Sequence, residues 1–469
     1  MEFYHENEEQ GQTDTLISRF DRMLQSGEYY FFDVDEFVQV IDHYLINSQY
    51  DKSKVAINYA LEQHPNLVIF MLKKAQFLFS TNKINKALEV LADVEDLEPE
   101  NPEVFMTRAG IYSHLKRYEK AIEEYSKALR DTEDLEEVYT NIAFEYENLG
   151  KYDKAIEYIT KALELNPDSE ALVYELSFCY EISRKTRESI SYFNEFLNKY
   201  PFSKAAWFNL GIAYNNDEQY ENAIQAYDFA LAIDESFSSA YFNKANSYAN
   251  LELYIKAIEF YNETFSHEDP EAMTYFYIGE CYDKLEKDKK ALDHYRKATE
   301  LDPLLADAWI GIGLLYKKKG KYLVAANHVK RALDIESSNP EYWLILGNVY
   351  QDAHLIDKAR ESYIRSSELD SRDADLWLEF SDSYALDNDY ETALDLIDEG
   401  LQGTRDKVVL LYRKSVYLMR LGRYKEAYLI LEDALVLNYD LYSEIFDYDP
   451  ELKHDNNLLR IIELYKNSD

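Results

Sequence analysis

The sequence is short of the residues and segments that several protein classes depend on. Only two cysteines, Cys179 and Cys281, occur among 469 residues, which excludes a disulfide-stapled scaffold and fits a reducing compartment. No apolar run approaches the length of a membrane span. The opening residues, MEFYHENEEQ, are acidic and lack the apolar core of a signal peptide. These absences together predict a cytoplasmic, soluble protein.

Basic residues are also scarce. The chain has 50 lysines and arginines against 89 aspartates and glutamates, a formal net charge of −39. Nucleic acid and anionic membrane surfaces are therefore disfavoured as partners, because phosphate binding needs a positive surface. The acidity favours a basic partner, or else it serves only to keep a long exposed chain soluble.

Catalytic and metal-binding motifs are missing as well. The sequence has no glycine-rich phosphate loop, no CxxC and no HExxH. Its nine histidines are scattered, although His294 and His328 lie 34 residues apart. Cys179 and Cys281 are separated by three such intervals, and we expect both to be buried packing thiols. We predict no enzyme activity, no cofactor and no metal.

The interval of 34 residues runs through nearly the whole chain. Around its middle, Trp207 is followed by Leu210-Gly211, by Tyr214 and by a small residue, Ala223. We number each repeat so that Trp207 is at position 4, and the same column recurs without insertion. Its members are large and apolar or aromatic: Phe37, Met71, Phe105, Tyr139, Val173, Trp207, Tyr241, Tyr275, Trp309, Trp343, Trp377 and Leu411. Position 11 is tyrosine in ten repeats, and position 20 is alanine in ten.

These columns predict a helix–turn–helix unit. Positions 4, 7, 8 and 11 share one face of a first helix, and small residues at positions 8 and 20 let the two helices approach closely. Gly150, Gly320 and Gly422 fall at position 15, where the turn is expected to need a positive φ. In Asn101-Pro102 and Asn339-Pro340, asparagine is the expected N-cap and proline the first helical residue.

The spacing W-x2-L-G-x2-Y with its later small residue resembles the tetratricopeptide repeat (TPR) family. The resemblance covers about twelve repeats, at 34–441, and the chain looks like the long cytoplasmic bacterial proteins made almost only of such repeats. It implies an all-α fold, a right-handed α-solenoid superhelix. It also implies a non-catalytic scaffold that holds a peptide or partner protein in a concave groove. That groove would be lined by positions 2, 5, 6, 9, 12 and 13 of the first helices. Residues 1–33 are expected to form a tail and capping helix, and 442–469 a C-terminal capping helix.

The groove columns of the middle repeats, at 139–284, combine aromatic rings with asparagines. Such asparagines resemble the ladder by which some family members grip a peptide backbone, since an amide both donates and accepts hydrogen bonds. In the alternative interpretation, the rings pack against neighbouring repeats and the asparagines are solvated. The candidate peptide-binding residues are Asn141, Tyr174, Phe178, Phe208, Asn209, Asn216, Phe242, Asn243, Asn246, Asn250, Phe276, Tyr277 and Glu280.

Charge in the groove columns is mostly acidic, so a basic peptide is the favoured ligand. One family subtype instead clamps the acidic tail of heat-shock chaperones, but position 5 carries no lysine or arginine in any repeat here, which argues against that role. The alternative function is a self-assembling structural solenoid. Self-association would use apolar residues near the N-terminus, namely Tyr29, Tyr30, Phe31 and Phe32.

Overall fold

The computed structural model describes residues 15–466, and these contain helices and connecting turns but no strand. The first part of the expected tail and capping helix, residues 1–14, lies outside the described residues. The chain divides into two compact units, Met1–Ala240 and Tyr241–Asp469.

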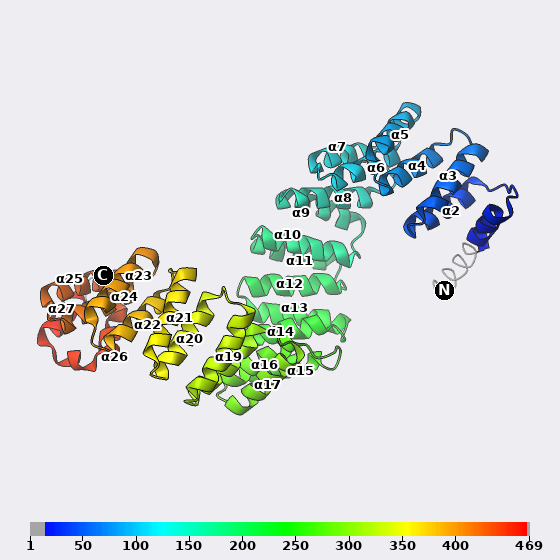
Figure 1. The fold of residues 1–469 in the computed structure, drawn as a ribbon. Helices are drawn as coiled ribbons and strands as arrows, with labels where there is room; N and C mark the ends of the chain where they lie inside the picture. The colour runs from blue at the N-terminus through cyan, green and yellow to red at the C-terminus, as the bar shows by residue number, and fades with distance from the viewer. Residues whose placement is uncertain (1–14, 467–469) are drawn as a thin grey trace. The chain divides into compact units, whose positions relative to one another are not determined.

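Unit 1 is a series of helix pairs in which each helix packs on the next (Figure 1). The first helix of a pair also contacts the first helix of the following pair, as α2 does with α4 and α10 with α12. A helix over 15–26 precedes the pairs. The pairs are α2 (Val34–Ile46), α3 (Tyr50–Gln63), α4 (Val68–Ser80), α5 (Ile84–Leu97), α6 (Pro102–His114), α7 (Tyr118–Ala128), α8 (Leu135–Asn148), α9 (Tyr152–Leu165), α10 (Glu170–Ile182), α11 (Thr186–Lys199), α12 (Lys204–Asn216) and α13 (Tyr220–Ile233).

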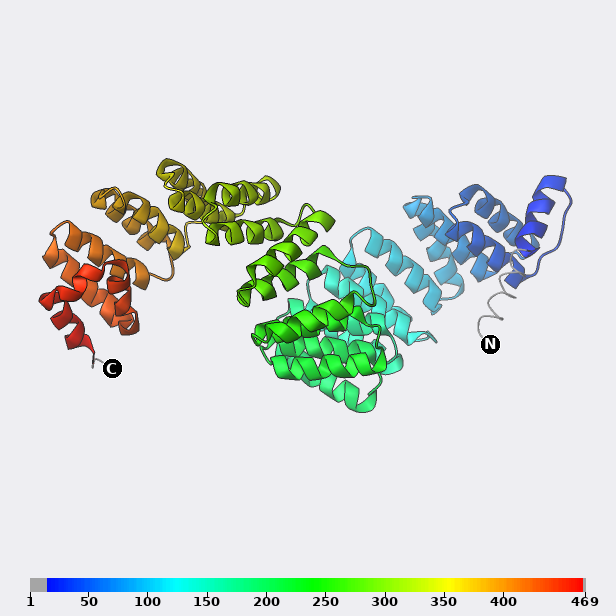
Figure 2. The same ribbon diagram turned by 90° about the horizontal axis from the view of Figure 1, so that it is seen from below.

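Unit 2 continues the same pairing and ends in short helices (Figure 2). The helix α14 begins three residues before the boundary and continues into this unit. The elements are α14 (Ser238–Asn250), α15 (Tyr254–Thr264), α16 (Ala272–Lys284), α17 (Asp288–Leu301), α18 (Ala306–Lys318), α19 (Tyr322–Ile335), α20 (Pro340–Asp352), α21 (Ile356–Leu369), α22 (Ala374–Ala385), α23 (Tyr390–Gly403), α24 (Val408–Arg420), α25 (Tyr424–Leu437), η1 (Tyr439–Ser443), α26 (Glu444–Tyr448), η2 (Pro450–His454) and α27 (Asn456–Tyr465).

The turns between the paired helices share one backbone conformation. Position 15 has a positive φ of 55–73° in each helix pair from α2/α3 to α24/α25. The residues there are Ser48, Asn82, Lys116, Gly150, Arg184, Glu218, Glu252, Glu286, Gly320, His354, Asn388 and Gly422. The positive φ expected at position 15 from its three glycines is confirmed. The same conformation also occurs where position 15 is not glycine, although it is strained for those residues. The packing of the two helices therefore imposes the turn whatever the residue.

Two predicted helix starts are also confirmed. Asn101 and Asn339 accept a hydrogen bond from the backbone N–H of Glu103 and Glu341, at 2.9 and 3.0 Å, and a proline follows each cap as the first helical residue. The side chain satisfies an amide that the helix itself leaves unbonded.

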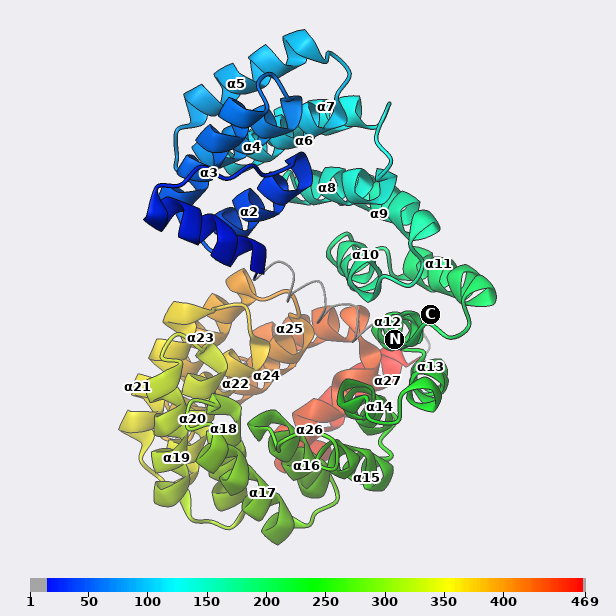
Figure 3. The same ribbon diagram turned by 90° about the vertical axis from the view of Figure 1, so that its right-hand side faces the viewer.

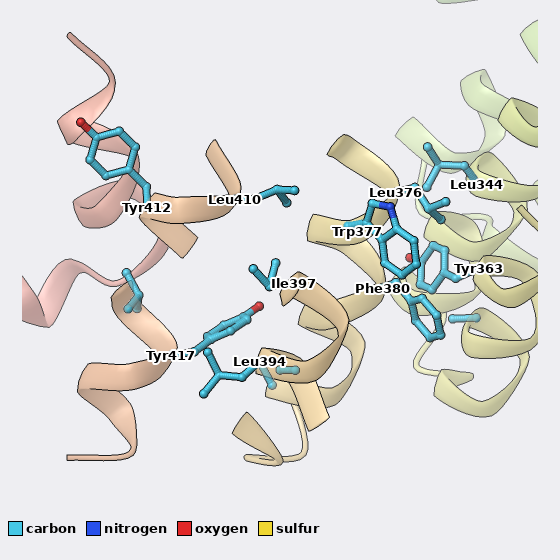
Figure 4. Close-up of a cluster of buried hydrophobic side chains, with 14 of the residues drawn as sticks. Leu344, Tyr363, Leu376, Trp377, Phe380, Leu394, Ile397, Leu410, Tyr412 and Tyr417 are labelled. Carbon is cyan, nitrogen blue, oxygen red and sulfur yellow. The ribbon is translucent and has the colours of Figure 1, made fainter. Parts of the chain in front are cut away.

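The core forms where the small residue at position 8 faces a ring at position 24. A Cβ atom added to Gly211 would lie 2.4 Å from the Tyr227 ring, and one added to Gly347 would lie 2.3 Å from Tyr363. Both tyrosines are buried. In unit 2 this core continues through α24, and Figure 4 shows its large side chains between successive helices. Glycine is required at these positions because the ring fills the space of a side chain.

The segments that precede and follow the helix pairs pack against the pairs next to them. Phe20 is fully buried with its ring 5.4 Å from Phe32 and 6.3 Å from Phe37. Phe32 is therefore a core residue, and its predicted part in self-association is wrong. At the other end, α27 packs on α25 and buries Leu458 and Ile462. The predicted capping roles of both ends stay predictions.

Candidate functional site

The segment predicted to bind a peptide, 139–284, crosses the boundary between the two units. Its unit 1 half comprises α8, α10 and α12, and its unit 2 half comprises α14 and α16.

In unit 1, α8 and α10 present exposed rings beside carboxylates. Phe144, Tyr174 and Phe178 are 55%, 37% and 45% exposed, although each is large and apolar. On the same helices, Glu147 lies three residues after Phe144 in α8, and Glu175 lies between Tyr174 and Phe178 in α10. We call these five residues the aromatic–acidic patch. Exposed rings of this size are costly to leave in water and commonly mark a binding surface.

The two carboxyl groups of the patch share a proton. Burial, followed by a hydrogen bond and repulsion from Glu175, raises the pKa of Glu147 to about 8. The thiol of Cys179 donates to Glu147 Oε1 at 3.5 Å, and burial raises the pKa of that thiol well above its ordinary value. Two negative charges this close are unfavourable, so one carboxyl group holds a proton at neutral pH.

Glu147, Glu175 and Cys179 also bring three possible metal-ligand atoms within 4.8 Å of one another. A metal would require a thiolate, whereas the raised thiol pKa favours the protonated form. This donor set thus fits a shared proton better than a metal ion. Sequence reasoning missed the group because Glu147 is at position 12 of one repeat and Glu175 at position 6 of the next. Their meeting depends on how the two repeats stack.

The next first helix, α12, corrects two predictions. Phe208 is 7% exposed, with its ring 4.8 Å from Phe237 and 5.9 Å from Tyr227. Asn209 is 2% exposed, and its amide donates to the backbone oxygen of Ala205 at 2.8 Å. Both were expected to face a peptide, yet both pack inside the repeat. The hydrogen bond one helical turn back satisfies the buried amide of Asn209, as a buried polar group requires.

Two other asparagines of this half remain at the surface. Asn141 is half-buried, and Asn216 is exposed. Asn216 and Glu181 line a depression of about 10 Å³, which has room for one water molecule. With Asn209 buried, the position 6 asparagines do not form a continuous ladder.

In unit 2, the predicted rings form a packed cluster. Phe242 lies 5.5 Å from Tyr261 and 5.6 Å from Tyr277, and Tyr277 stacks on Tyr261 at 5.9 Å. The Tyr261 hydroxyl donates to Asn246 Oδ1 at 2.5 Å. The structure thus brings Phe242, Asn246 and Tyr277 together around a core tyrosine. Asn243 is half-buried, and Asn250 is exposed.

Phe276 is another correction. It is 9% exposed and lies 5.8 Å from the buried Tyr295, so position 5 is part of the repeat core here as it is at Phe208. One helical turn further on, Glu280 is exposed as a whole residue, but its carboxyl group is partly desolvated. This desolvation, followed by repulsion from Asp307, raises the pKa of Glu280. Asp307 accepts a hydrogen bond from the Tyr342 hydroxyl at 2.6 Å. The first helices of this unit thus also carry concentrated negative charge.

The sequence matches three family models, each described as tetratricopeptide repeat. The first matches 136–169, 205–237 and 272–303, the second matches 72–135, and the third matches 238–264 and 306–339. The chain is a member of the tetratricopeptide repeat family. The count of about twelve repeats stays a prediction, as does the handedness of a superhelix.

Several solved structures are similar to this chain at low sequence identity. The APC/C hetero-tetramer Cut9–Hcn1 is 15% identical, with a TM-score of 0.42, over 90% of this chain and 94% of that chain. A TPR repeat-containing protein from Cytophaga hutchinsonii is 19% identical, with a TM-score of 0.41, over 54% of this chain and 98% of its solved C-terminal part. YrrB, a TPR protein with an unusual peptide-binding site, is 21% identical, with a TM-score of 0.33, over 39% and 94%. No curated protein matches the sequence.

Membership of this family gives the general class of the protein, an interaction scaffold with helical repeats. Within residues 15–466, none of the helices combines the length and apolar character needed to cross a membrane.

Proposed function

We propose that the aromatic–acidic patch of α8 and α10 binds a basic segment of a partner protein. The observation that carries the proposal is the proton-sharing pair Glu147 and Glu175 beside the exposed rings of Phe144 and Phe178. No other part of the predicted segment combines exposed rings with paired carboxyl groups among the described residues.

A lysine or arginine side chain complements this patch in two ways. Its charge stabilises both carboxylates, so the shared proton leaves when the cation arrives. Its neighbouring apolar atoms, or an adjacent apolar residue, cover Phe144 and Phe178, and cations also bind favourably over aromatic faces. Buried rings would then supply most of the affinity. Nucleic acid and anionic lipid are disfavoured by the same carboxylates.

Binding should therefore depend on pH. The pKa of about 8 at Glu147 means that a proton must be released before the pair carries two charges. We expect the affinity for a basic partner to rise as the pH increases from 6 to 9. Substituting both glutamates by glutamine should remove this dependence.

The test is capture of partners from the native cytoplasm on full-length protein, read by mass spectrometry. We compare the wild type with Phe144→Ala/Phe178→Ala and with Glu147→Gln/Glu175→Gln. The matched control is Glu164→Gln/Glu195→Gln, which makes the same two residue changes on the second helices α9 and α11, where both glutamates are exposed. Basic proteins lost only in the two patch variants would support the proposal. Identical protein lists from all variants would contradict it.

Self-assembly keeps one observation in its favour, since Tyr29 and Phe31 are each 63% exposed beside buried Phe32. The molecular mass in solution, measured over a hundredfold range of concentration, tests it. A monomer at the highest concentration would contradict self-assembly and leave the scaffold proposal in place.

A further inference from the structure

A second column of aromatic contacts lies away from the aromatic–acidic patch. In several repeats, the side chain at position 23 of the second helix lies between the rings at positions 4 and 11 of the first helix. His328 is the clearest case, because its ring stacks on Trp309 at 5.7 Å and on Tyr316 at 5.4 Å, with interplanar angles of 16° and 2°.

Other repeats fill the same place with a flat ring of their own. Tyr158 lies 6.0 Å from Tyr139 and 5.6 Å from Tyr146. His294 lies 6.1 Å from Tyr275 and 5.1 Å from Tyr282. The filling residue thus differs between histidine and tyrosine, but it is planar in each of these repeats.

The repeat 204–237 shows what happens when position 23 is small. Ala226 stands there, and Phe229, three residues on, stacks on Trp207 at 4.3 Å with an interplanar angle of 24°. A ring about one turn further along the same helix therefore covers Trp207, which Ala226 leaves uncovered.

The repeat 340–373 has no aromatic ring at position 23 and none three residues further on. Position 23 is Ser362, and three residues on stands Arg365, which pairs with Glu368 at 2.7 Å. Among the described residues, no aromatic ring is within stacking distance of Trp343, whose indole N–H donates to the backbone oxygen of Ser337. The ring of Tyr350 is approached by Lys330 and Lys358, at 5.4 and 5.7 Å from its centroid.

A cavity of about 530 Å³ occupies this place between α19, α20 and α21, which lie side by side in Figure 3. Its walls include Trp343, Leu346 and Tyr350, with Ser362 at the position that carries a ring in the repeats of Tyr158, His294 and His328. This volume is within the range of ligand sites and exceeds what one ring needs. The fold therefore leaves open here a slot that it closes elsewhere with its own side chains.

The charged residues around the cavity indicate which charge a ligand of the cavity should carry. Lys330, Lys358 and Arg365 line it together with Glu361 and Glu368. Because Arg365 pairs with Glu368, two lysines face the single remaining carboxylate, which gives a local excess of positive charge on a strongly acidic protein. A negatively charged group on the ligand complements these two lysines at the edge of the cavity.

We propose that the cavity at Trp343 and Tyr350 binds an aromatic side chain of a partner protein that has a carboxylate beside it. The ring takes the place that His328 takes in the preceding repeat, between the rings of positions 4 and 11. The carboxylate pairs with Lys330 and Lys358. This site differs from the aromatic–acidic patch in its residues, its unit and the charge it selects.

The test uses full-length protein and the probe peptide N-acetyl-Asp-(5-fluoro-Trp)-Asp amide, followed by fluorine NMR line broadening. We expect binding by the wild type and by Ser362→Ala, which keeps the cavity open. Ser362→Tyr supplies the missing ring and should weaken binding at least tenfold. Exchanging the aspartates of the probe for lysines should also weaken binding, because the lysines at the rim then repel it.

Trp343→Leu is a second variant, which removes one face of the slot, and helical circular dichroism checks that each variant folds. Unchanged binding by folded Ser362→Tyr and Trp343→Leu would overturn the proposal, and so would the absence of binding by the wild type. Adenosine monophosphate serves as a competing probe. If it binds to the cavity and the peptide does not, the aromatic side chain is overturned as the occupant and a nucleotide takes its place.

Discussion

The adjacent repeats 306–339 and 340–373 have the same framework and different interiors. Both carry tryptophan at position 4, tyrosine at position 11 and glycine at position 8. In the first, His328 is sandwiched between Trp309 and Tyr316. In the second, Ser362 leaves a cavity of about 530 Å³ at the equivalent place. The side chains at position 23 and three residues further on thus decide whether a repeat is closed or open, since repeat 204–237 closes with Phe229 although its position 23 is Ala226.

Opening the closed repeat should have the largest effect. His328→Ser removes two stacked ring pairs and leaves a cavity, so we expect a loss of about 2–4 kcal/mol in local stability. Amide hydrogen exchange in α18 and α19 measures it, since repeat proteins unfold in parts. His328→Phe, which keeps a ring, should lose much less. An equal loss in both variants would mean that stacking is not what closes the repeat.

The position 8 glycines of the two repeats should tolerate a methyl group unequally. A Cβ on Gly347 would lie 2.3 Å from the buried Tyr363 ring, whereas one on Gly313 would lie 2.9 Å from a methyl group of Val329. We expect Gly347→Ala to cost about 1–3 kcal/mol and Gly313→Ala less, because a rigid ring cannot yield as a methyl group can. Thermal unfolding of both variants gives the order, and a larger loss for Gly313→Ala would reverse our interpretation.

Closing the open repeat is the reverse experiment. Ser362→His places a ring between Trp343 and Tyr350 and should raise local stability by about 1 kcal/mol, the worth of one to two ring contacts. Slower amide exchange in α20 and α21 would show it. Destabilisation would indicate that these two rings are not spaced to receive a third.

The turns of the two repeats offer a smaller contrast. Gly320 and His354 share position 15, with φ of 69° and 57°. A side chain in this conformation is strained, so His354→Gly should stabilise the protein by roughly 0.5–1 kcal/mol. The same thermal unfolding measurement applies, with Gly320→Ala expected to shift the midpoint in the opposite direction. No shift for His354→Gly would show that histidine is unstrained there.

Acid should slightly lower the local stability of the closed repeat, 306–339, through His328. The open repeat, 340–373, has no histidine at this position and should not lose stability in this way. Burial first, then the charges of Arg331 and Arg296, lower the pKa of His328 below 6.5, so the folded state keeps this imidazole neutral. As the pH falls below 6.5, the unfolded state gains the proton first, and stability declines. We expect exchange protection in α18 and α19 to fall between pH 7 and pH 5.5. In His328→Phe this decline should be smaller, and an identical decline would assign it to other groups.

The sequence by itself determined the architecture. Its columns predicted helix pairs, the caps at Asn101 and Asn339, and a special turn at position 15, since all of these depend on residues close together in the chain. The same reasoning placed Tyr174 and Phe178 at the surface, where the structure also has them. It predicted that Phe208 and Phe276 line the groove as Tyr174 does, because all three occupy position 5.

Only the tertiary structure decided which of these equivalent positions are exposed. Phe208 is covered by Tyr227 and Phe237, whereas Tyr174 remains 37% exposed. Glu147 and Glu175 lie 28 residues apart in the chain and share a proton once two repeats stack. The cavity beside Ser362 lies between the rings of Trp343 and Tyr350, and the preceding repeat contacts both of them through Ser337 and Lys330. A repeating sequence fixes which columns meet, but the local volume of each neighbour decides what remains open to solvent or to a ligand.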